Sequence, residues 1–126
     1  IENVRVMCAD AVEVFKNNIA DHSLEGVFIF FPDPWHKKKH HKRRIIQPDF
    51  IALIEKKLKH GGLLQLATDW EDYAQHMLDV MKANLAFNNT SQNNEYSDRG
   101  DRPVTKFEKR GLKLGHKVWD LVFKRP

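Results

Sequence analysis

The fold of this chain is decided by residues 26–35, which read Gly-Val-Phe-Ile-Phe-Phe-Pro-Asp-Pro-Trp. The apolar run at residues 26–31 is rich in aromatic and β-branched side chains, which is typical of a strand buried on both faces of a parallel sheet. Pro32 must end that strand, because proline has no N–H to donate to a neighbouring strand. Asp33 then lies between two prolines that stiffen the backbone on both sides of it. The stretch predicts a strand that ends in a rigidly held carboxylate.

Strand and helix patterns alternate on both sides of this stretch. Further strands are expected at residues 4–8, 62–68 and 117–123, and helices at residues 10–19, 48–58 and 68–81. Residues 88–94 are polar without periodicity and are expected to form a loop. This order predicts one α/β domain with a mainly parallel sheet and helices on both of its faces.

Acidic residues follow three successive predicted strands, namely Asp10, Asp33 and Asp69. Ligands of open α/β sheets bind beyond the carboxyl ends of the strands, so these three positions predict a site. Asp10 and Asp69 also begin predicted helices, where a carboxylate is favourable without any ligand. Asp33 is more distinctive because its backbone is stiff and Trp35 beside it offers a ring on which a base could stack. A purely structural Pro-Asp-Pro turn is the alternative.

The positive charge of the chain is concentrated in one place. The 126 residues carry a net charge of +4, and every residue at positions 36–44 is Lys, Arg or His. Six Lys and Arg lie in that run, and without them the net charge of +4 becomes −2. Such a patch indicates contact with a polyanion, because Lys and Arg neutralise phosphates and release counterions. A merely solvated basic face is the alternative.

The composition excludes several classes of protein. No apolar run approaches the roughly 20 residues that a membrane-spanning helix needs. The single cysteine, Cys8, excludes a disulfide framework and fits a reducing compartment. His36, His40 and His41 have a spacing that metal sites use, but the lysines among them would repel a divalent ion. We therefore expect no metal.

Several longer motifs resemble the bacterial tRNA (guanine-N7-)-methyltransferase family. They are residues 30–37 (Phe-Phe-Pro-Asp-Pro-Trp-His-Lys), 41–44 (His-Lys-Arg-Arg) with Gln47, 67–70 (Ala-Thr-Asp-Trp), 102–108 (Arg-Pro-Val-Thr-Lys-Phe-Glu) with Arg110 and Gly111, and 114–121 (Leu-Gly-His-Lys-Val-Trp-Asp-Leu). The resemblance covers essentially the whole chain. It implies a partial Rossmann-like class I methyltransferase fold in a cytoplasmic enzyme. The implied reaction transfers the methyl group of S-adenosyl-L-methionine to N7 of the guanine at position 46 in the variable loop of tRNA.

The resemblance also implies roles for particular residues. Asp33 looks like the catalytic position and also like a contact to the cofactor, and Asp10 looks like the residue at the adenine end of S-adenosyl-L-methionine. The positions that look like tRNA-substrate contacts are Lys37, Asp69, Thr105, Lys106, Phe107 and Glu108.

One part of the family pattern is absent. Family members carry, ahead of a segment like residues 1–8, a strand with a glycine-rich loop for the cofactor and an acidic residue for its ribose. No such loop occurs in this sequence. Residues 1–126 are therefore expected to be the C-terminal portion of one methyltransferase domain, which alone binds S-adenosyl-L-methionine poorly.

Two other interpretations stay open at the level of sequence. One is an RNA-binding module that uses the basic patch at residues 37–44 and Trp35 without chemistry. The other is a cationic segment on an α/β core that binds acidic protein partners. Whether the protein is a monomer or a homodimer is left undecided.

Overall fold

A computed structural model of the chain describes residues 3–5, 11–91, 95–97 and 117–126. Its elements, in chain order, are β1 (Asn3–Arg5), α1 (Ala11–Asn17), β2 (Leu24–Phe30), the 3-10 helix η1 (Lys38–Arg43), α2 (Pro48–Lys57), β3 (Leu58–Thr68), α3 (Glu71–Ala83), β4 (Asn88–Asn89) and β5 (Trp119–Lys124). Among the described residues, no helix has both the length and the apolar character that crossing a membrane requires.

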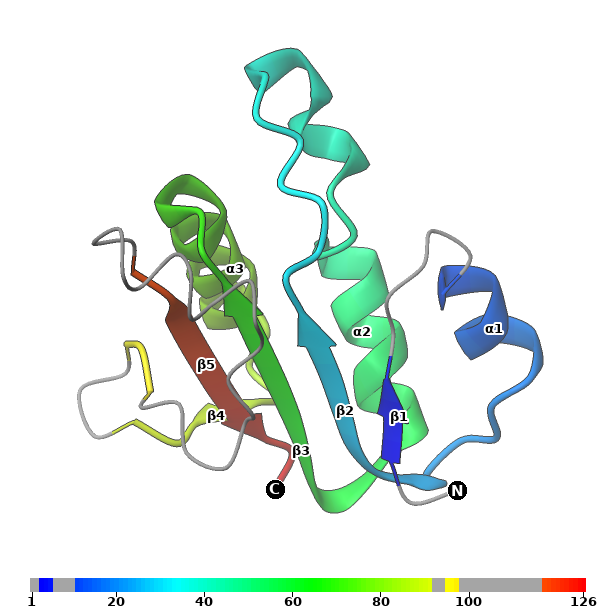
Figure 1. The fold of residues 1–126 in the computed structure, drawn as a ribbon. Helices are drawn as coiled ribbons and strands as arrows, with labels where there is room; N and C mark the ends of the chain where they lie inside the picture. Colours follow the sequence, from blue (N-terminus) through cyan, green and yellow to red (C-terminus); the bar gives the residue numbers. More distant parts are fainter. Residues whose placement is uncertain (1–2, 6–10, 92–94, 98–116) are drawn as a thin grey trace.

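The five strands form one sheet in the order β1-β2-β3-β5-β4. β1 runs parallel to β2, and β2 runs parallel to β3, whereas β5 is antiparallel to both β3 and β4. The predicted α/β fold with a parallel centre is confirmed, and the sheet becomes mixed beyond β3 (Figure 1). An antiparallel strand on an otherwise parallel sheet is common in α/β proteins. The parallel part places the ends of β2 and β3 at one edge.

The three described α-helices cover one face of the sheet. α2 contacts both α1 and α3, and Figure 1 shows α2 and α3 behind the strands, with α1 beside α2. The cause is the handedness of the connections: β1-α1-β2 and β2-α2-β3 move along the sheet in the same direction, and right-handed crossovers then place both helices on the same side. Within the part of the chain that the structure describes, helices therefore cover a single face, where the sequence pattern predicted both.

The core lies between this face and the helices. Three strands contribute buried side chains to it, among them Val27 and Ile29 from β2, Leu64 and Leu66 from β3, and Leu121 and Phe123 from β5. They form one cluster with Phe15 of α1, Ile54 of α2 and Met77 of α3. Phe28 and Phe30 lie on the other face of the sheet and are only half-buried. The prediction that β2 is fully buried on both faces is therefore wrong for this second face.

Several element boundaries differ from the sequence prediction, most clearly the starts of β3 and α3. β3 begins at Leu58 rather than Gly62, because Leu58 already pairs with Leu24 at the start of β2. The positive φ of Gly61, 83°, then allows the chain to bend before it enters the main register. α3 is capped by Trp70 rather than by Thr68, whose hydroxyl instead accepts a hydrogen bond from the Trp70 N–H at 3.2 Å.

Leu66 and Leu85 are expected to contribute very differently to stability, because only Leu66 is buried. Leu66 is fully buried in β3, whereas Leu85 is 93% exposed. We expect Leu66→Ala to lower the free energy of unfolding by about 3–4 kcal/mol, since it removes buried methyl groups and leaves a cavity. Leu85→Ala should change it by less than about 0.5 kcal/mol. Urea denaturation of the natural protein that carries this chain measures both, and equal losses would contradict the core described here.

Candidate functional site

The loop at residues 31–35 leaves the end of β2 under backbone strain. Phe31 and Trp35 have φ values of 53° and 45°, a left-handed region that side chains other than glycine rarely adopt. The Phe31 N–H donates to the Ala67 carbonyl at 2.8 Å, and the Trp35 N–H donates to Asp33 Oδ1 at 2.9 Å. Strain of this kind costs about 1–3 kcal/mol per residue and is concentrated at functional sites. We call residues 31–35 the strand-end loop.

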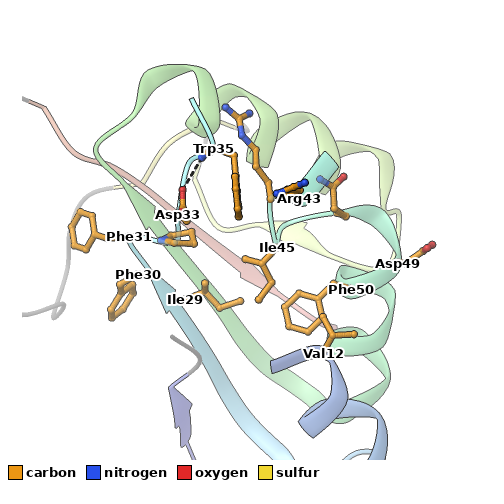
Figure 2. Close-up of a pocket in the computed structure, with 13 residues that line it drawn as sticks. Val12, Ile29, Phe30, Phe31, Asp33, Trp35, Arg43, Ile45, Asp49 and Phe50 are labelled. Carbon is orange, nitrogen blue, oxygen red and sulfur yellow. Dashed lines mark hydrogen bonds between the residues drawn. The ribbon is translucent and has the colours of Figure 1, made fainter. Parts of the chain in front are cut away.

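A cavity of about 550 Å³ opens beside the strand-end loop. Figure 2 shows that its lining is largely apolar, with side chains such as Ile29 from β2, Val12 from α1 and Phe50 from α2. Asp33 and Trp35 are part of the lining, and the Asp33 side chain is exposed. A cavity of this volume, mostly apolar with a few polar groups, has the character of a small-molecule site. The arrangement suits an organic ligand with flat apolar rings and a few polar groups.

The basic run forms an arm that stands out from the body of the protein (Figure 1). This basic arm consists of residues 37–43, where η1 follows Lys37. Its exposed cations are Lys37, Lys38, Lys39, Lys42 and Arg43. The Arg43 guanidinium lies 5.3 Å from the centre of the Trp35 ring, and the His40 ring meets the edge of Trp35 at 5.9 Å. Positive charge therefore lies directly beside the cavity.

Arg44 follows the basic arm but does not share its environment. Its side chain is buried, with its Nε donating to the Pro34 carbonyl and its Nη2 to Asp72 Oδ2, each at 2.6 Å. The hydrogen bond from Arg44 holds the pKa of Asp72 below its usual range. The sequence pattern counted Arg44 with the cations of the phosphate-binding patch, whereas its side chain is buried in the structure. The available signal was the apolar pair Ile45 and Ile46 that follows it, since the chain re-enters the core there.

Some of the site residues that the sequence predicted lie at the same edge of the sheet. Asp33 and Asp69 both follow parallel neighbouring strands, and Phe30 pairs with Ala67 just before them. Both carboxylates are exposed, as is Lys37. The His36 ring packs edge-on against Trp70, with centroids 4.2 Å apart, so the loop after β2 contacts the residues after β3. Asp10, Thr105, Lys106, Phe107 and Glu108 lie outside the described residues.

The histidines of the run do not form a metal site in the described part of the chain, where no three His, Cys, Asp or Glu side chains lie close enough to hold an ion. His41 Nε2 lies 3.6 Å from Asp72 Oδ2, and His40 contacts Trp35. His36 packs on Trp70. Each of the three histidines therefore has a different neighbour.

Comparison with known proteins gives a family and close relatives. A family described as "Putative methyltransferase" matches residues 1–121. The chain is 59% identical over 126 residues to the tRNA (guanine-N(7)-)-methyltransferase of Shewanella amazonensis, covering 99% of this chain and 53% of that protein. It is 57% identical over 124 residues to the protein of the same name from Pseudomonas aeruginosa, covering 98% and 51%. The chain thus spans about half the length of the curated relatives it matches.

Solved structures that resemble the chain do so at low identity. One is a SAM-dependent O-methyltransferase from Thermotoga maritima, with a TM-score of 0.47 and 14% identity, covering 89% of this chain and 37% of that one. Another is the aminoglycoside resistance methyltransferase NpmB1, with a TM-score of 0.47 and 12% identity, covering 84% and 54%.

Ionisation of the buried Tyr73 hydroxyl is expected to make stability depend on pH in the alkaline range. The Tyr73 ring is fully buried, its hydroxyl accepts a hydrogen bond from the Ile46 N–H at 3.2 Å, and burial raises its pKa to about 12. Between about pH 10 and 12 the unfolded chain loses this proton while the folded chain keeps it. The free energy of unfolding should therefore fall as pH rises, by at most about 1.4 kcal/mol per pH unit from this group.

Urea midpoints of the natural protein between pH 8 and pH 11 measure this dependence. In Tyr73→Phe the alkaline decline should become shallower, because the titrating hydroxyl is gone. Tyr96 is only partly buried, so Tyr96→Phe should keep most of the decline. An unchanged slope in Tyr73→Phe would show that its ionisation is not coupled to folding.

Proposed function

This chain belongs to the family described as "Putative methyltransferase", and we propose that its natural protein is a tRNA (guanine-N7-)-methyltransferase. The proposed reaction transfers a methyl group from S-adenosyl-L-methionine to N7 of the guanine at position 46 in the variable loop of tRNA, in the cytoplasm. Relatives that carry this activity in their names support the proposal at 57–59% identity. The structural observation that carries it is Asp33, on a strained loop between a ligand-sized cavity and a basic arm.

The described residues fit part of an S-adenosyl-L-methionine site. The apolar lining of the cavity can pack against flat rings, and the exposed carboxylate of Asp33 has the charge that a sulfonium attracts. When bound, this cosubstrate supplies a methyl group on positively charged sulfur. Asp10 is proposed to contact its adenine end, and this role rests on the family resemblance.

The chemistry places modest demands on the protein. Guanine N7 carries a lone pair, so it attacks the methyl carbon without first losing a proton. The N7–carbon bond forms as the carbon–sulfur bond breaks, the electron pair of that bond stays on sulfur, and the positive charge passes to the guanine. No general base is needed, and catalysis comes mainly from holding N7 in line with the methyl group. Correct alignment of two reactants accelerates reactions by many orders of magnitude.

Asp33 is suited to this alignment rather than to covalent catalysis. Its backbone is fixed by two prolines, and its Oδ1 already accepts the Trp35 N–H. The remaining acceptor capacity of the carboxylate can orient an N–H of the base, and its charge stabilises the positive charge that moves through the site. Trp35, held between Arg43 and His40, offers a stacking face for a base.

The tRNA contacts are proposed partly from the structure and partly from the family resemblance. The basic arm supplies five exposed cations for backbone phosphates, among them Lys37. Asp69 lies at the same sheet edge as Asp33, where it can accept hydrogen bonds from the substrate. The substrate roles of Thr105, Lys106, Phe107 and Glu108 rest on the family resemblance.

Product analysis tests the proposed function directly. The natural protein is incubated with unmodified tRNA and S-adenosyl-L-methionine, and 7-methylguanosine is measured by mass spectrometry after nuclease digestion. We expect Asp33→Ala to lower kcat by about 100-fold or more, as loss of a preorganised polar group does. Its Kd for tRNA should stay within about threefold, because phosphate contacts dominate binding.

A matched control is Asp79→Ala, which removes an exposed carboxylate on α3 that accepts a hydrogen bond from Gln75. It should leave both kcat and Kd unchanged. If Asp33→Ala weakened tRNA binding as much as it slowed turnover, Asp33 would be a binding residue only.

The basic arm favours one alternative function, an RNA-binding module without catalysis. Its cations are exposed, and the arm stands out from the body, so the arm can bind RNA without any cosubstrate. Tight tRNA binding without formation of 7-methylguanosine would support this alternative.

Under either function, the affinity for tRNA should depend strongly on salt. We expect a negative slope of log Kobs against log salt concentration, and the double substitution Lys38→Ala/Lys39→Ala should make the slope shallower by about one to two. Lys82→Ala, at the far end of α3, should leave it unchanged. Fluorescence titrations at several salt concentrations measure the slopes, and an unaltered slope in the double variant would remove the arm from the RNA interface.

A further inference from the structure

We propose that Arg44 is a positioning residue that orients the Asp33 carboxylate through the backbone and does not bind phosphate. The proposal deepens the methyl-transfer site and rests on the proposed function above. Arg44 directly follows the basic arm in sequence, but its side chain is 1% exposed, whereas the cations of the arm are exposed. A guanidinium with so little exposure presents no donor to a nucleic-acid backbone.

Arg44 and Asp33 hold the same peptide group from opposite sides. The Arg44 Nε donates to the Pro34 carbonyl at 2.6 Å, and the N–H of that peptide, on Trp35, donates to Asp33 Oδ1 at 2.9 Å. A peptide group is planar, so fixing the direction of its carbonyl also fixes the direction of its N–H. The orientation of the Asp33 carboxylate therefore depends on Arg44, although the two side chains need not touch.

The guanidinium is itself fixed by α3. Nη2 donates to Asp72 Oδ2 at 2.6 Å, and the guanidinium carbon lies 4.6 Å from the centre of the Tyr73 ring. Tyr73 is in turn held by its hydrogen bond from the Ile46 N–H. Arg44 therefore connects the strand-end loop to the first turn of α3, and it does so with two donors that point in different directions.

This geometry requires arginine rather than a positive charge alone. The planar guanidinium offers Nε and Nη2 at fixed angles, whereas a lysine has one ammonium at the end of a flexible chain. Lysine at this position can approach Asp72 or the Pro34 carbonyl, but it cannot reproduce both hydrogen bonds and the packing on Tyr73. Arg44→Lys thus keeps the charge and removes the positioning, which separates the two roles.

The test compares Arg44→Lys with the unaltered natural protein in three measurements. We expect kcat at saturating tRNA to fall about 10- to 100-fold, because misplacement of a reacting group by about 1 Å has effects of this size. The KM for tRNA and the salt slope of tRNA binding should each stay within about twofold of the values for the unaltered protein. The 19F NMR signal of 5-fluorotryptophan at Trp35, assigned with Trp35→Phe, should shift in the absence of tRNA, because the peptide before Trp35 is no longer held.

A second variant keeps the test decisive if Arg44→Lys does not fold. The Asp72 side chain is 60% exposed, so Asp72→Asn removes the charge partner without burying a new charge. It should shift the Trp35 signal in the same direction and lower kcat by a smaller factor, with the KM for tRNA unchanged. A Trp35 signal that is unmoved in both variants would overturn the proposal.

An unchanged kcat in Arg44→Lys, with a KM for tRNA raised well beyond twofold, would make Arg44 a phosphate contact and contradict the proposal, because lysine keeps the charge but not the two fixed donors of arginine. If the unaltered protein forms no 7-methylguanosine, the proposed function fails, whereas the Trp35 signal and the affinity for tRNA still decide the role of Arg44.

Discussion

β2 stops pairing with β3 one residue beyond its end, because the Phe31 N–H is the last that can donate before Pro32. The chain must then leave the sheet through two prolines and two residues with positive φ, and this exit brings Asp33 to the edge of the sheet. Such a conformation is unfavourable by itself and persists where surrounding contacts hold it. The buried Arg44, hydrogen-bonded to the Pro34 carbonyl and to Asp72, is the main contact of this kind in the described residues.

The same exit explains why the site combines an apolar cavity with dense positive charge. The chain leaves β2, forms the basic arm in open solvent and returns through Ile46 and α2 into the core. The return places apolar side chains such as Ile45 and Phe50 in the cavity below the strand-end loop, while Arg43 of the arm lies beside Trp35 (Figure 2). A small organic ligand and a polyanion can thus bind at adjoining surfaces, which is what methyl transfer to a nucleic-acid base requires.

Much of this arrangement could be predicted from the sequence, because strand ends are marked by local signals. The apolar run before Pro32 predicted β2, Pro48 predicted the start of α2, and the order of elements predicted the α/β fold. The position of Asp33 at a sheet edge followed from these elements alone.

The burial of Arg44 could not be predicted, because it depends on Asp72 and Tyr73, which lie 28 and 29 positions further along the chain. The early start of β3 at Leu58 is likewise set by pairing with Leu24, which no local periodicity reports. The assignment of Asp10 and of Thr105, Lys106, Phe107 and Glu108 depended on family resemblance.

We propose that the methyl group is transferred at the strand-end loop. The most direct measurement is a structure of the natural protein bound to tRNA and to S-adenosyl-L-homocysteine, the demethylated form of the methyl donor. In this complex we expect the guanine at position 46 to lie within hydrogen-bonding distance of Asp33 and tRNA phosphates to lie on the basic arm. Arg44 should still donate hydrogen bonds to the Pro34 carbonyl and to Asp72. A guanine bound away from the strand-end loop, or an Arg44 side chain turned outward onto a phosphate, would contradict this proposal.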